Sequence, residues 1–486
     1  MFKRGAGILL PISALWSEGG IGTLGEAAYR FVDRLAEAGQ KYWQVLPNGP
    51  VGESGSPYQP DCALAGNPFY IDLHRLHRVG LLRKNEMPVS DGRFVNYSQI
   101  CRERPRLLKE AFTRFRRSDG MDEFCRENAE WLDGYALFYA LKKHFHGADF
   151  RSWPEQVLHR DKQALERLSE ELDEDIRFCK FCQYAFFTDW YALRRYANEA
   201  GVKIIGDMPI YVSPDGADVW LHPEQFEVDA SLNLTKVAGV PPDEFCKDGQ
   251  RWGNPLYNWE VMESDSFGWW RRRMEQASVM YDAVRVDHFI GFARYYSIPA
   301  ESKDARSGRW RRGPGIRLTR ALDEVRGDTD LLAENLGIMH PTVERLLERT
   351  GYYGMNVMQF GFDGSTDNRH LPHNAQKRTA VYISTHDSDT AMGWIGKCPP
   401  DEQKYVADYV GARTRNQMHD SLLRAVYAQV SDLAILQMQD VLGLGSSARM
   451  NTPGTATGNW RWRMAQHEFS DLVAQKLRGL ATLYGR

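Results

Sequence analysis

Four short apolar segments of this 486-residue chain end on an acidic side chain. The acids are Asp207 in GDMPI, Asp287 in RVDHF, Glu334 in AENLG and Asp387 in THDSD, and Arg285 lies two residues before Asp287. A single acid after a strand often caps the next helix. Four acids of this kind, accompanied by an arginine, instead predict a site where carboxyl groups meet.

Carboxyl groups that meet in a cleft repel one another and lose hydration, so one should keep its proton near neutral pH. Another should stay ionised, and we expect Arg285 to hold Asp287 in that state. Such a pair suits cleavage of a glycosidic bond, in which one carboxyl protonates the leaving oxygen and the other attacks or stabilises the anomeric carbon. Aromatic residues make up 12% of the chain, and flat rings stack on sugar faces.

The acids need a scaffold that brings strand ends together. Apolar segments typical of strands buried on both faces alternate with segments of helical periodicity. Seven strands are expected, at residues 7–13, 41–47, 202–210, 282–289, 331–337, 355–362 and 380–387, and an eighth is placed at 442–451. This order predicts an α/β fold, a closed (β/α)8 TIM barrel, in which the strand ends converge on one face.

Uneven spacing of the strands predicts inserted subdomains within a single catalytic barrel that spans residues 1–486. One insertion, at about 48–201, is expected to be mostly helical. The other, at about 211–280, is expected to be loop-rich and to contribute an active-site lid, for which residues 239–257 are the candidate.

Composition excludes several classes of partner. The 61 Lys and Arg against 64 Asp and Glu give a net charge of −3, which argues against a nucleic-acid partner, and RWRR at 309–312 is expected to be solvated surface. No segment approaches the roughly 18 apolar residues of a membrane span. With Pro11 interrupting the first apolar stretch and seven scattered cysteines, we expect a cytoplasmic protein.

No cofactor or metal is expected. The CKFC pair at 179–182 has no second pair of ligands, and the sequence has no Asp-rich calcium loop. The glycine-rich GLGSSA at 443–448 follows no strand and has no ribose-binding acid about 20 residues later. The sequence makes no prediction of the oligomeric state.

A series of motifs runs in order from end to end of the chain and resembles the 4-α-glucanotransferases, also called amylomaltases or disproportionating enzymes, of the α-amylase clan. The motifs are GILLPISAL, WQVLPNGPVG, SPYQP, AGNPFYIDL, GDMPIYV, ADVW, GVPPDEF, GQRWGNPLY, VRVDHFIGF, AENLG, LPHN, STHDSDT, ARMNTPGT and NWRWR. The resemblance implies a barrel enzyme that cuts an α-1,4-glucan, such as a maltooligosaccharide, amylose or a glycogen-derived glucan. It implies transfer of the cut segment to another glucan or to glucose.

The resemblance also implies residue roles. Asp287 falls at the nucleophile, Glu334 at the general acid/base and Asp387 at the third acid, which grips sugar hydroxyls. Positions that contact substrate in the family match Arg285, His288, His386, Asp207, Tyr58, Asn67, Trp252, Asn451 and Pro453. A retaining reaction of this type implies carboxyl groups about 5 to 5.5 Å apart in the catalytic pair.

The chain departs from the family pattern at a few places. Asn335 and Ser388 replace the more common Asp and Asn, and VGESG at 51–55 replaces the usual glycine-rich sequence. These changes affect the expected sugar contacts and leave the three acids in place. The residues alone do not distinguish a transferase from an α-amylase-like hydrolase, which uses the same acids. A glucan-binding protein without activity would need the aromatic residues but not the acids.

Overall fold

The computed structural model describes residues 2–90, 92–116, 118–242, 247–337 and 339–486. In this part of the chain, eight parallel strands form one sheet in the order β10-β11-β12-β1-β2-β3-β6-β9. Parallel bridging between Leu332 and Tyr353 joins its two ends and closes a barrel. The strands are β1 (Gly5–Leu9), β2 (Tyr42–Gln44), β3 (Lys203–Met208), β6 (Ala283–Val286), β9 (Asp330–Ala333), β10 (Gly354–Val357), β11 (Thr379–Tyr382) and β12 (Leu433–Gln437).

The predicted barrel is confirmed, but the eighth strand was placed wrongly. Residues 442–451 form a turn with a short 3-10 helix at Ser446–Ala448, and the eighth strand is β12 at Leu433–Gln437. Every residue of β12 is buried, and the strand lies between β11 and β1. Its run of four apolar residues, Leu433 to Leu436, is separated from the end of helix α17 at Ala428 by only four residues, so periodicity alone does not separate the strand from the helix.

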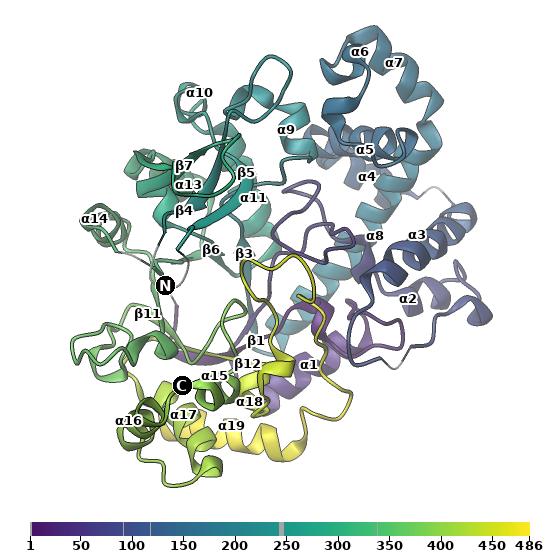
Figure 1. Ribbon diagram of the computed structural model, residues 1–486. Coiled ribbons are helices and arrows are strands. Elements are labelled where there is room, and N and C mark those ends of the chain that lie inside the picture. The colour runs from purple at the N-terminus through teal and green to yellow at the C-terminus, as the bar shows by residue number, and fades with distance from the viewer. Residues whose placement is uncertain (1, 91, 117, 243–246, 338) are drawn as a thin grey trace.

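Helices surround the barrel (Figure 1), and each one buries an apolar stripe. They include α1 (Glu26–Glu37), α8 (Asp173–Glu199), α11 (Gly268–Met280), α13 (Ile316–Val325), α14 (Pro341–Thr350), α16 (Pro400–Val410), α17 (Arg415–Ala428) and α19 (Asp471–Leu483). Shorter helices follow several strands: α12 (Ile290–Ala293), α15 (Ala391–Lys397) and α18 (Met438–Val441). Gly351 ends α14 in the left-handed conformation that favours glycine.

Between β2 and β3 the chain forms a helical region on one flank of the barrel, at the upper right of Figure 1. Its helices are α2 (Leu73–Arg78), α3 (Tyr97–Arg114), α4 (Asp119–Glu127), α5 (Ala129–His144), α6 (Glu155–Leu158) and α7 (Lys162–Glu171). They pack largely against the first half of α8, where Phe178, Phe181 and Phe187 contact aromatic rings of α3, α4 and α5. None of the described helices is long and apolar enough to cross a membrane.

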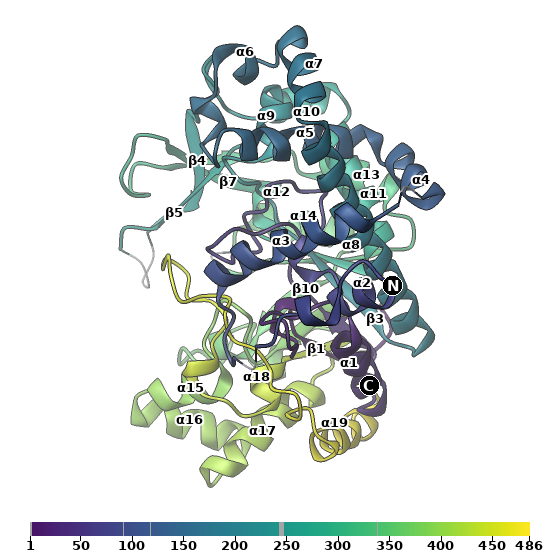
Figure 2. The ribbon, with the colours of Figure 1, turned by 90° about the vertical axis from the view of Figure 1, so that its right-hand side faces the viewer.

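A second, antiparallel sheet stands beside the barrel in the order β5-β4-β7-β8. Its strands are β4 (Lys236–Val240), β5 (Gln250–Pro255), β7 (Arg294–Pro299) and β8 (Arg309–Arg312). In the sequence, α9 (Ala217–Leu221) precedes β4, and α10 (Trp259–Ser264) follows β5. The segment expected to be loop-rich thus contributes two strands. In Figure 2, β4, β5 and the yellow chain after α18 project on the same side of the barrel. Residues 243–246 of the predicted lid lie outside the described residues.

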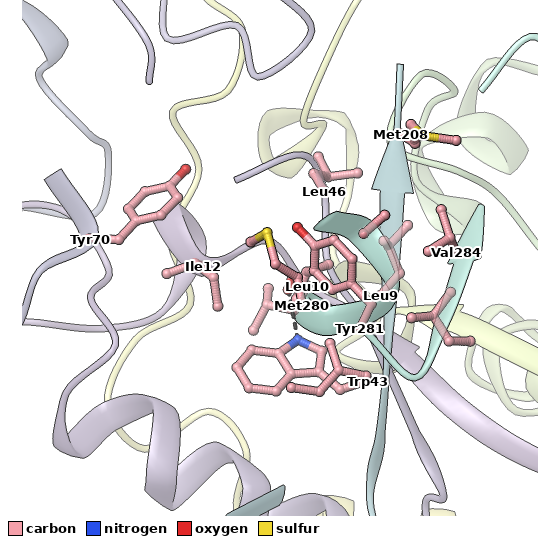
Figure 3. Packing of buried hydrophobic residues seen from close by; sticks show 14 of the residues in the cluster. Leu9, Leu10, Ile12, Trp43, Leu46, Tyr70, Met208, Met280, Tyr281 and Val284 are labelled. Carbon is pink, nitrogen blue, oxygen red and sulfur yellow. Dashed lines mark hydrogen bonds between the residues drawn. The ribbon is translucent and has the colours of Figure 1, made fainter. Parts of the chain in front are cut away.

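Buried hydrophobic side chains pack around the barrel strands (Figure 3), where Trp43 contacts Phe31 of α1 and Tyr281 contacts Trp190 of α8. Trp43 is fully buried and its indole N–H donates to the Leu10 carbonyl at 2.8 Å. The Tyr281 ring lies against Gly206, where a Cβ would come within 2.2 Å of the ring. The residue before Asp207 therefore has to be glycine for Tyr281 to pack there.

Candidate active site

Three of the four predicted acids come from neighbouring barrel strands. Asp207 lies on β3 and pairs in register with Arg285 on β6, while Asp287 directly follows β6. Glu334 directly follows β9, which pairs with β6 on its other side. Parallel strands end at the same edge, so the three acids meet at the carboxyl end of the barrel.

Arg285 connects two of these acids. Its Nη1 atom lies 2.8 Å from both carboxylate oxygens of Asp207 and 3.0 Å from Oδ1 of Asp287. The Asp207 side chain is fully buried, whereas that of Asp287 is 24% exposed. Burial alone would lower the pKa of Arg285, but the two acids raise it well above its ordinary value. The guanidinium therefore stays charged, and Asp287 is the carboxylate on it that a ligand can reach.

Glu334 has the opposite surroundings. Its carboxylate accepts the backbone N–H of His288 at 2.7 Å and that of Leu336 at 2.9 Å. Burial raises the pKa of Glu334 to about 7, and the charge of Asp287 adds to this rise against the opposing effect of Arg285. Near neutral pH a large fraction of Glu334 is protonated, as the sequence-based argument expected of one acid in the group.

His288 links Asp287 and Glu334 through the backbone. Its φ of 45° is rare for a residue other than glycine, and the backbone in this left-handed conformation donates its N–H to Glu334. The ring meets Trp252 edge to face, with centroids 4.9 Å apart. Burial lowers the pKa of His288 to about 4, so its ring is neutral at pH 7. Its Nε2 is buried and has no hydrogen-bond partner among the described residues.

Asp387 lies on the loop after β11. Asn451 donates its side-chain N–H to Oδ1 at 2.6 Å, and Nε2 of His386 lies 3.3 Å from Oδ2. Burial would raise the pKa of Asp387, but His386 and the Asn451 amide outweigh it and hold the pKa below the ordinary range. The side chain is 45% exposed, so Asp387 presents an ionised carboxylate to the opening of the site.

Tyr58 joins the loop after β11 to the charged group on β3. Its hydroxyl donates to Oδ2 of Asp207 at 2.8 Å and lies 2.7 Å from Nε2 of His386. The Tyr58 and His386 rings also stack, with centroids 5.4 Å apart and an interplanar angle of 14°. Tyr58, His386 and Asp207 are therefore in direct contact in one network with Arg285.

The remaining predicted residues have different surroundings. Trp252 lies on β5 and reaches the cluster through its contact with His288. Pro453 is exposed on the loop that follows Asn451. Asn67 is fully buried, and its side-chain oxygen accepts the N–H of Phe69 to cap a turn, so the described contacts do not bring Asn67 into the cluster.

Asp440 is a buried residue near the site that the sequence reasoning missed. It lies on α18, directly after β12, and accepts the Ser384 hydroxyl at 2.5 Å and the Ala391 N–H at 2.7 Å. Gln437 donates to the Ser384 oxygen at 2.5 Å. Asp440 thus holds both ends of the loop that carries Asp387. An acid that follows a recognised eighth strand would have been a candidate, but that strand was placed elsewhere.

The arrangement supports one kind of chemistry in particular. A protonated Glu334 and an arginine-bound Asp287 meet at the open end of a barrel, and aromatic rings and a third acid lie beside them. This division of charge between two carboxyls is what glycosidic bond cleavage requires. Among the described residues, no group of three His, Cys, Asp or Glu side chains is placed to hold a metal ion. Fold and site define a glycoside-cleaving barrel enzyme.

Comparison with known proteins identifies the family. The model of the 4-alpha-glucanotransferase family matches residues 10–468. The 4-alpha-glucanotransferase of Thermus thermophilus is 43% identical and that of Clostridium butyricum 40% identical, each over 98% of this chain and over 98% and 100% of the relative. The solved amylomaltase from Streptococcus agalactiae in complex with acarbose has a TM-score of 0.97 at 37% identity, with 100% of both chains covered.

The chain belongs to the 4-alpha-glucanotransferase family, glycoside hydrolase family 77. It is accordingly an enzyme of the amylomaltase type, and the resemblance found in its motifs is confirmed. The family acts on α-1,4-glucans by a retaining double displacement.

Proposed function

We propose that this enzyme moves α-1,4-glucan segments from a donor maltooligosaccharide to another glucan or to glucose, with Asp287 as nucleophile and Glu334 as general acid/base. The observation that carries these roles is the contrast between the two carboxyls. Glu334 is buried and has its pKa raised to about 7, whereas Asp287 lies 3.0 Å from the Arg285 guanidinium and is partly exposed.

In the first step, Glu334 donates its proton to the glycosidic oxygen while Asp287 attacks the anomeric carbon. The C1–O bond to the leaving glucan breaks, and a covalent bond between C1 and Asp287 forms. In the second step, Glu334 takes the proton of an acceptor hydroxyl, which attacks C1 and releases Asp287. The two inversions retain the anomeric configuration. The carboxyl separation of about 5 to 5.5 Å that this mechanism needs stays a prediction.

The other residues hold the sugar. Asp387 is ionised and partly exposed, which suits it to accept hydrogen bonds from sugar hydroxyls as the ring distorts. The free Nε2 of neutral His288 is a further partner for a hydroxyl, and the Trp252 ring is a stacking surface. The amylomaltase from Streptococcus agalactiae was solved in complex with acarbose, which supports a sugar-like ligand for this enzyme.

Two features of the proposal concern the surroundings of the reaction. Transfer requires that water be kept from the covalent intermediate, and the segment 239–257 is our candidate for this lid because Trp252 within it contacts His288. We also propose a cytoplasmic location and a reaction without cofactor, on the basis of the cysteine pattern and of the acids, which suffice for the chemistry.

The products formed from maltotriose test the reaction. We expect glucose together with longer maltooligosaccharides, separated by chromatography over a time course. A ladder of shorter sugars alone would make the enzyme a hydrolase. Asp287→Asn tests the nucleophile: we expect transfer to fall by several orders of magnitude while maltotriose still binds, and transfer near the wild-type rate would exclude Asp287 from that role.

A further inference from the structure

A large cavity lies away from the charged cluster at the strand ends. Its volume is about 1020 Å³, and it is bounded by β7, β8 and the helices α10, α13 and α14, which lie at the upper left of Figure 1. None of the residues proposed for the reaction lines it. The cavity is as large as a typical small-molecule site, and the proposed reaction has no use for it.

The walls of this cavity carry an excess of positive charge. Of the charged lining residues, six are cationic and three acidic. Two of the cations have acidic partners within the cavity, since Lys236 lies 2.6 Å from Glu227 and Arg317 lies 2.7 Å from Glu263. The other four form no ion pair with a described carboxylate. They are Arg311 and Arg312 on β8 and Arg345 and Arg349 on α14.

This excess contrasts with the whole chain, whose net charge is −3. Arginines that converge on one concavity repel one another unless an anion lies between them. Arg311 and Arg312 belong to the RWRR segment that the sequence analysis assigned to solvated surface. In the structure, Arg311 is only partly exposed, and its Nε is buried without a hydrogen-bond partner among the described residues. The Nε–H group of Arg311 is therefore a hydrogen-bond donor without an acceptor in this part of the structure.

The surroundings of the arginines favour a phosphate group. The guanidinium fork matches the geometry of phosphate oxygens, and pairs of this kind are strong because both partners are charged. Helix α13 also begins at the cavity, where no side chain caps its first turn and no acid is present in that turn. Its free N–H groups add to the positive potential that the arginines create.

The rest of the lining favours a sugar next to the phosphate. The Trp259 ring is partly exposed at the cavity wall, and the largely buried Tyr295 also lines the cavity. Asn258 and Thr342 provide polar groups beside the rings. Aromatic rings with amide and hydroxyl groups around them are suited to the apolar faces and the hydroxyls of a pyranose.

We propose that this cavity is a binding site for a sugar phosphate, in which arginines of β8 and α14 hold the phosphate and Trp259 stacks on the sugar ring. The site is separate from the one that cleaves the glucan, and the proposal does not depend on the roles given to Asp287 and Glu334. The ligand class is a phosphate monoester of a hexose, a small anion that the net charge of the chain alone would not predict.

Calorimetric titration of the full chain with glucose 6-phosphate tests the proposal. We expect saturable binding that weakens as salt is raised, because the contacts are ionic. Arg345→Gln together with Arg349→Gln should weaken binding about tenfold or more, since each removes a charge-assisted hydrogen bond. Both residues are exposed on α14, so folding should be unaffected. Arg320→Gln is the matched control, because Arg320 is exposed on α13 but does not line the cavity.

Two further ligands separate the parts of the proposal. Unmodified glucose should not displace glucose 6-phosphate, because it lacks the group that the arginines hold. Inorganic phosphate should bind more weakly than glucose 6-phosphate, and Trp259→Ala should remove that difference. Absence of glucose 6-phosphate binding at millimolar concentration, or equal binding to the double variant, would overturn the proposal. Equal affinity for inorganic phosphate would overturn its sugar part.

Discussion

At the scale of single residues, the site gives two carboxyl groups, those of Asp287 and Glu334, different surroundings. Asp287 contacts a permanently charged guanidinium, whereas Glu334 is enclosed and receives only two backbone N–H groups. Burial favours the neutral form of Glu334 and outweighs the opposing effect of Arg285. This difference in environment between two carboxyl groups is what supports the proposed roles of acid for Glu334 and nucleophile for Asp287.

The raised pKa of Glu334 predicts the alkaline side of the pH profile. The first step needs its proton, so kcat/KM for maltotriose should fall as pH rises through about 7. Glu334→Gln removes the titrating group, and activity should fall about 10²- to 10⁴-fold or more without that alkaline limb. The measurement is the initial rate between pH 5 and 9. A wild-type profile that stays flat up to pH 9 would contradict the assignment.

The raised pKa of Glu334 also predicts how the stability of the folded protein depends on pH. Its pKa is about 7 in the folded protein against an ordinary 4.5, so the unfolded chain releases this proton first as pH rises. The folded state therefore loses stability between about pH 4.5 and 7, by up to roughly 3 kcal/mol. Glu334→Gln avoids that loss and should be more stable than the wild type at pH 8 but not at pH 4. Denaturant unfolding at both pH values measures the difference, and an equal effect at both would contradict it.

The residue-level predictions from sequence worked best where residues belong to a strand end. Asp207, Arg285, Asp287 and Glu334 follow from the position of β3, β6 and β9, because a parallel sheet aligns such ends. The role of Asn67 stays a prediction: a motif match gives no information on burial, and in the structure Asn67 is fully buried and its side chain caps a turn. Contacts such as that between Tyr58 and Asp207 depend on the packing of distant loops.

At the scale of elements, the loop from 384 to 391 depends on a side chain of the following unit. The fully buried Asp440 accepts hydrogen bonds from the Ser384 hydroxyl at one end of the loop and from the Ala391 N–H at the other. A fixed loop holds Asp387 and His386 in place before the substrate binds, and preorganisation of this kind lowers the barrier.

Asp440→Asn should therefore lower kcat for maltotriose about tenfold, because the amide cannot accept both hydrogen bonds with the same strength. If the effect passes through the loop, Ser384→Ala combined with Asp440→Asn should cost less than the sum of the single changes in a double-mutant cycle. Asp401→Asn, at an exposed position on α16, is the matched control. Additive effects would show that Asp440 does not act through Ser384.

The hairpin of β4 and β5 allows a direct test of the lid. Val240 pairs with Gln250, so residues 241–249 can be replaced by a two-residue Asn-Gly turn without a change of register. We expect hydrolysis to rise relative to transfer, because water gains access to the covalent intermediate. The ratio of reducing ends formed to glycosyl groups transferred measures this. An unchanged ratio would show that residues 241–249 do not keep water from the covalent intermediate.

Elements were predictable where helix and strand patterns were well separated. Seven barrel strands were located because loops or helices of clear periodicity isolate them. β12 was missed because its five residues, LAILQ, lie between α17 and α18 without a turn signal of glycine or proline. The second sheet was also missed, since β8 reads RWRR and shows no apolar alternation at an exposed edge.

At the scale of the whole molecule, two arginines fasten the ends of the chain to the barrel. Arg486 is buried, and its guanidinium donates to the carbonyls of Tyr427 at 2.7 Å, Gln429 at 2.8 Å and Ser431 at 3.0 Å. Arg4 donates to the carbonyls of Gln429 and Ser431 from the other side. These carbonyls belong to the segment that leads into β12, which pairs with β1. The two arginines thus satisfy backbone groups that no strand can reach.

Loss of Arg486 should consequently weaken the whole barrel. Arg486→Ala removes the side-chain donor of the buried Tyr427 carbonyl and leaves Arg4 as the side-chain donor to Gln429 and Ser431. We expect a cost of about 1 to 3 kcal/mol and a thermal midpoint lower by a few degrees. Arg486→Lys should recover only part of this, because an ammonium lacks the planar fork that bonds several carbonyls at once. Arg424→Ala is the control, because Arg424 lies on α17 and donates a hydrogen bond to the Tyr484 hydroxyl at an exposed place. If Arg486 stabilises the barrel by supporting the pairing of β12 with β1, amide hydrogen exchange in Arg486→Ala should become faster in both strands. Faster exchange in α19 alone would instead show that only the end of the chain frays.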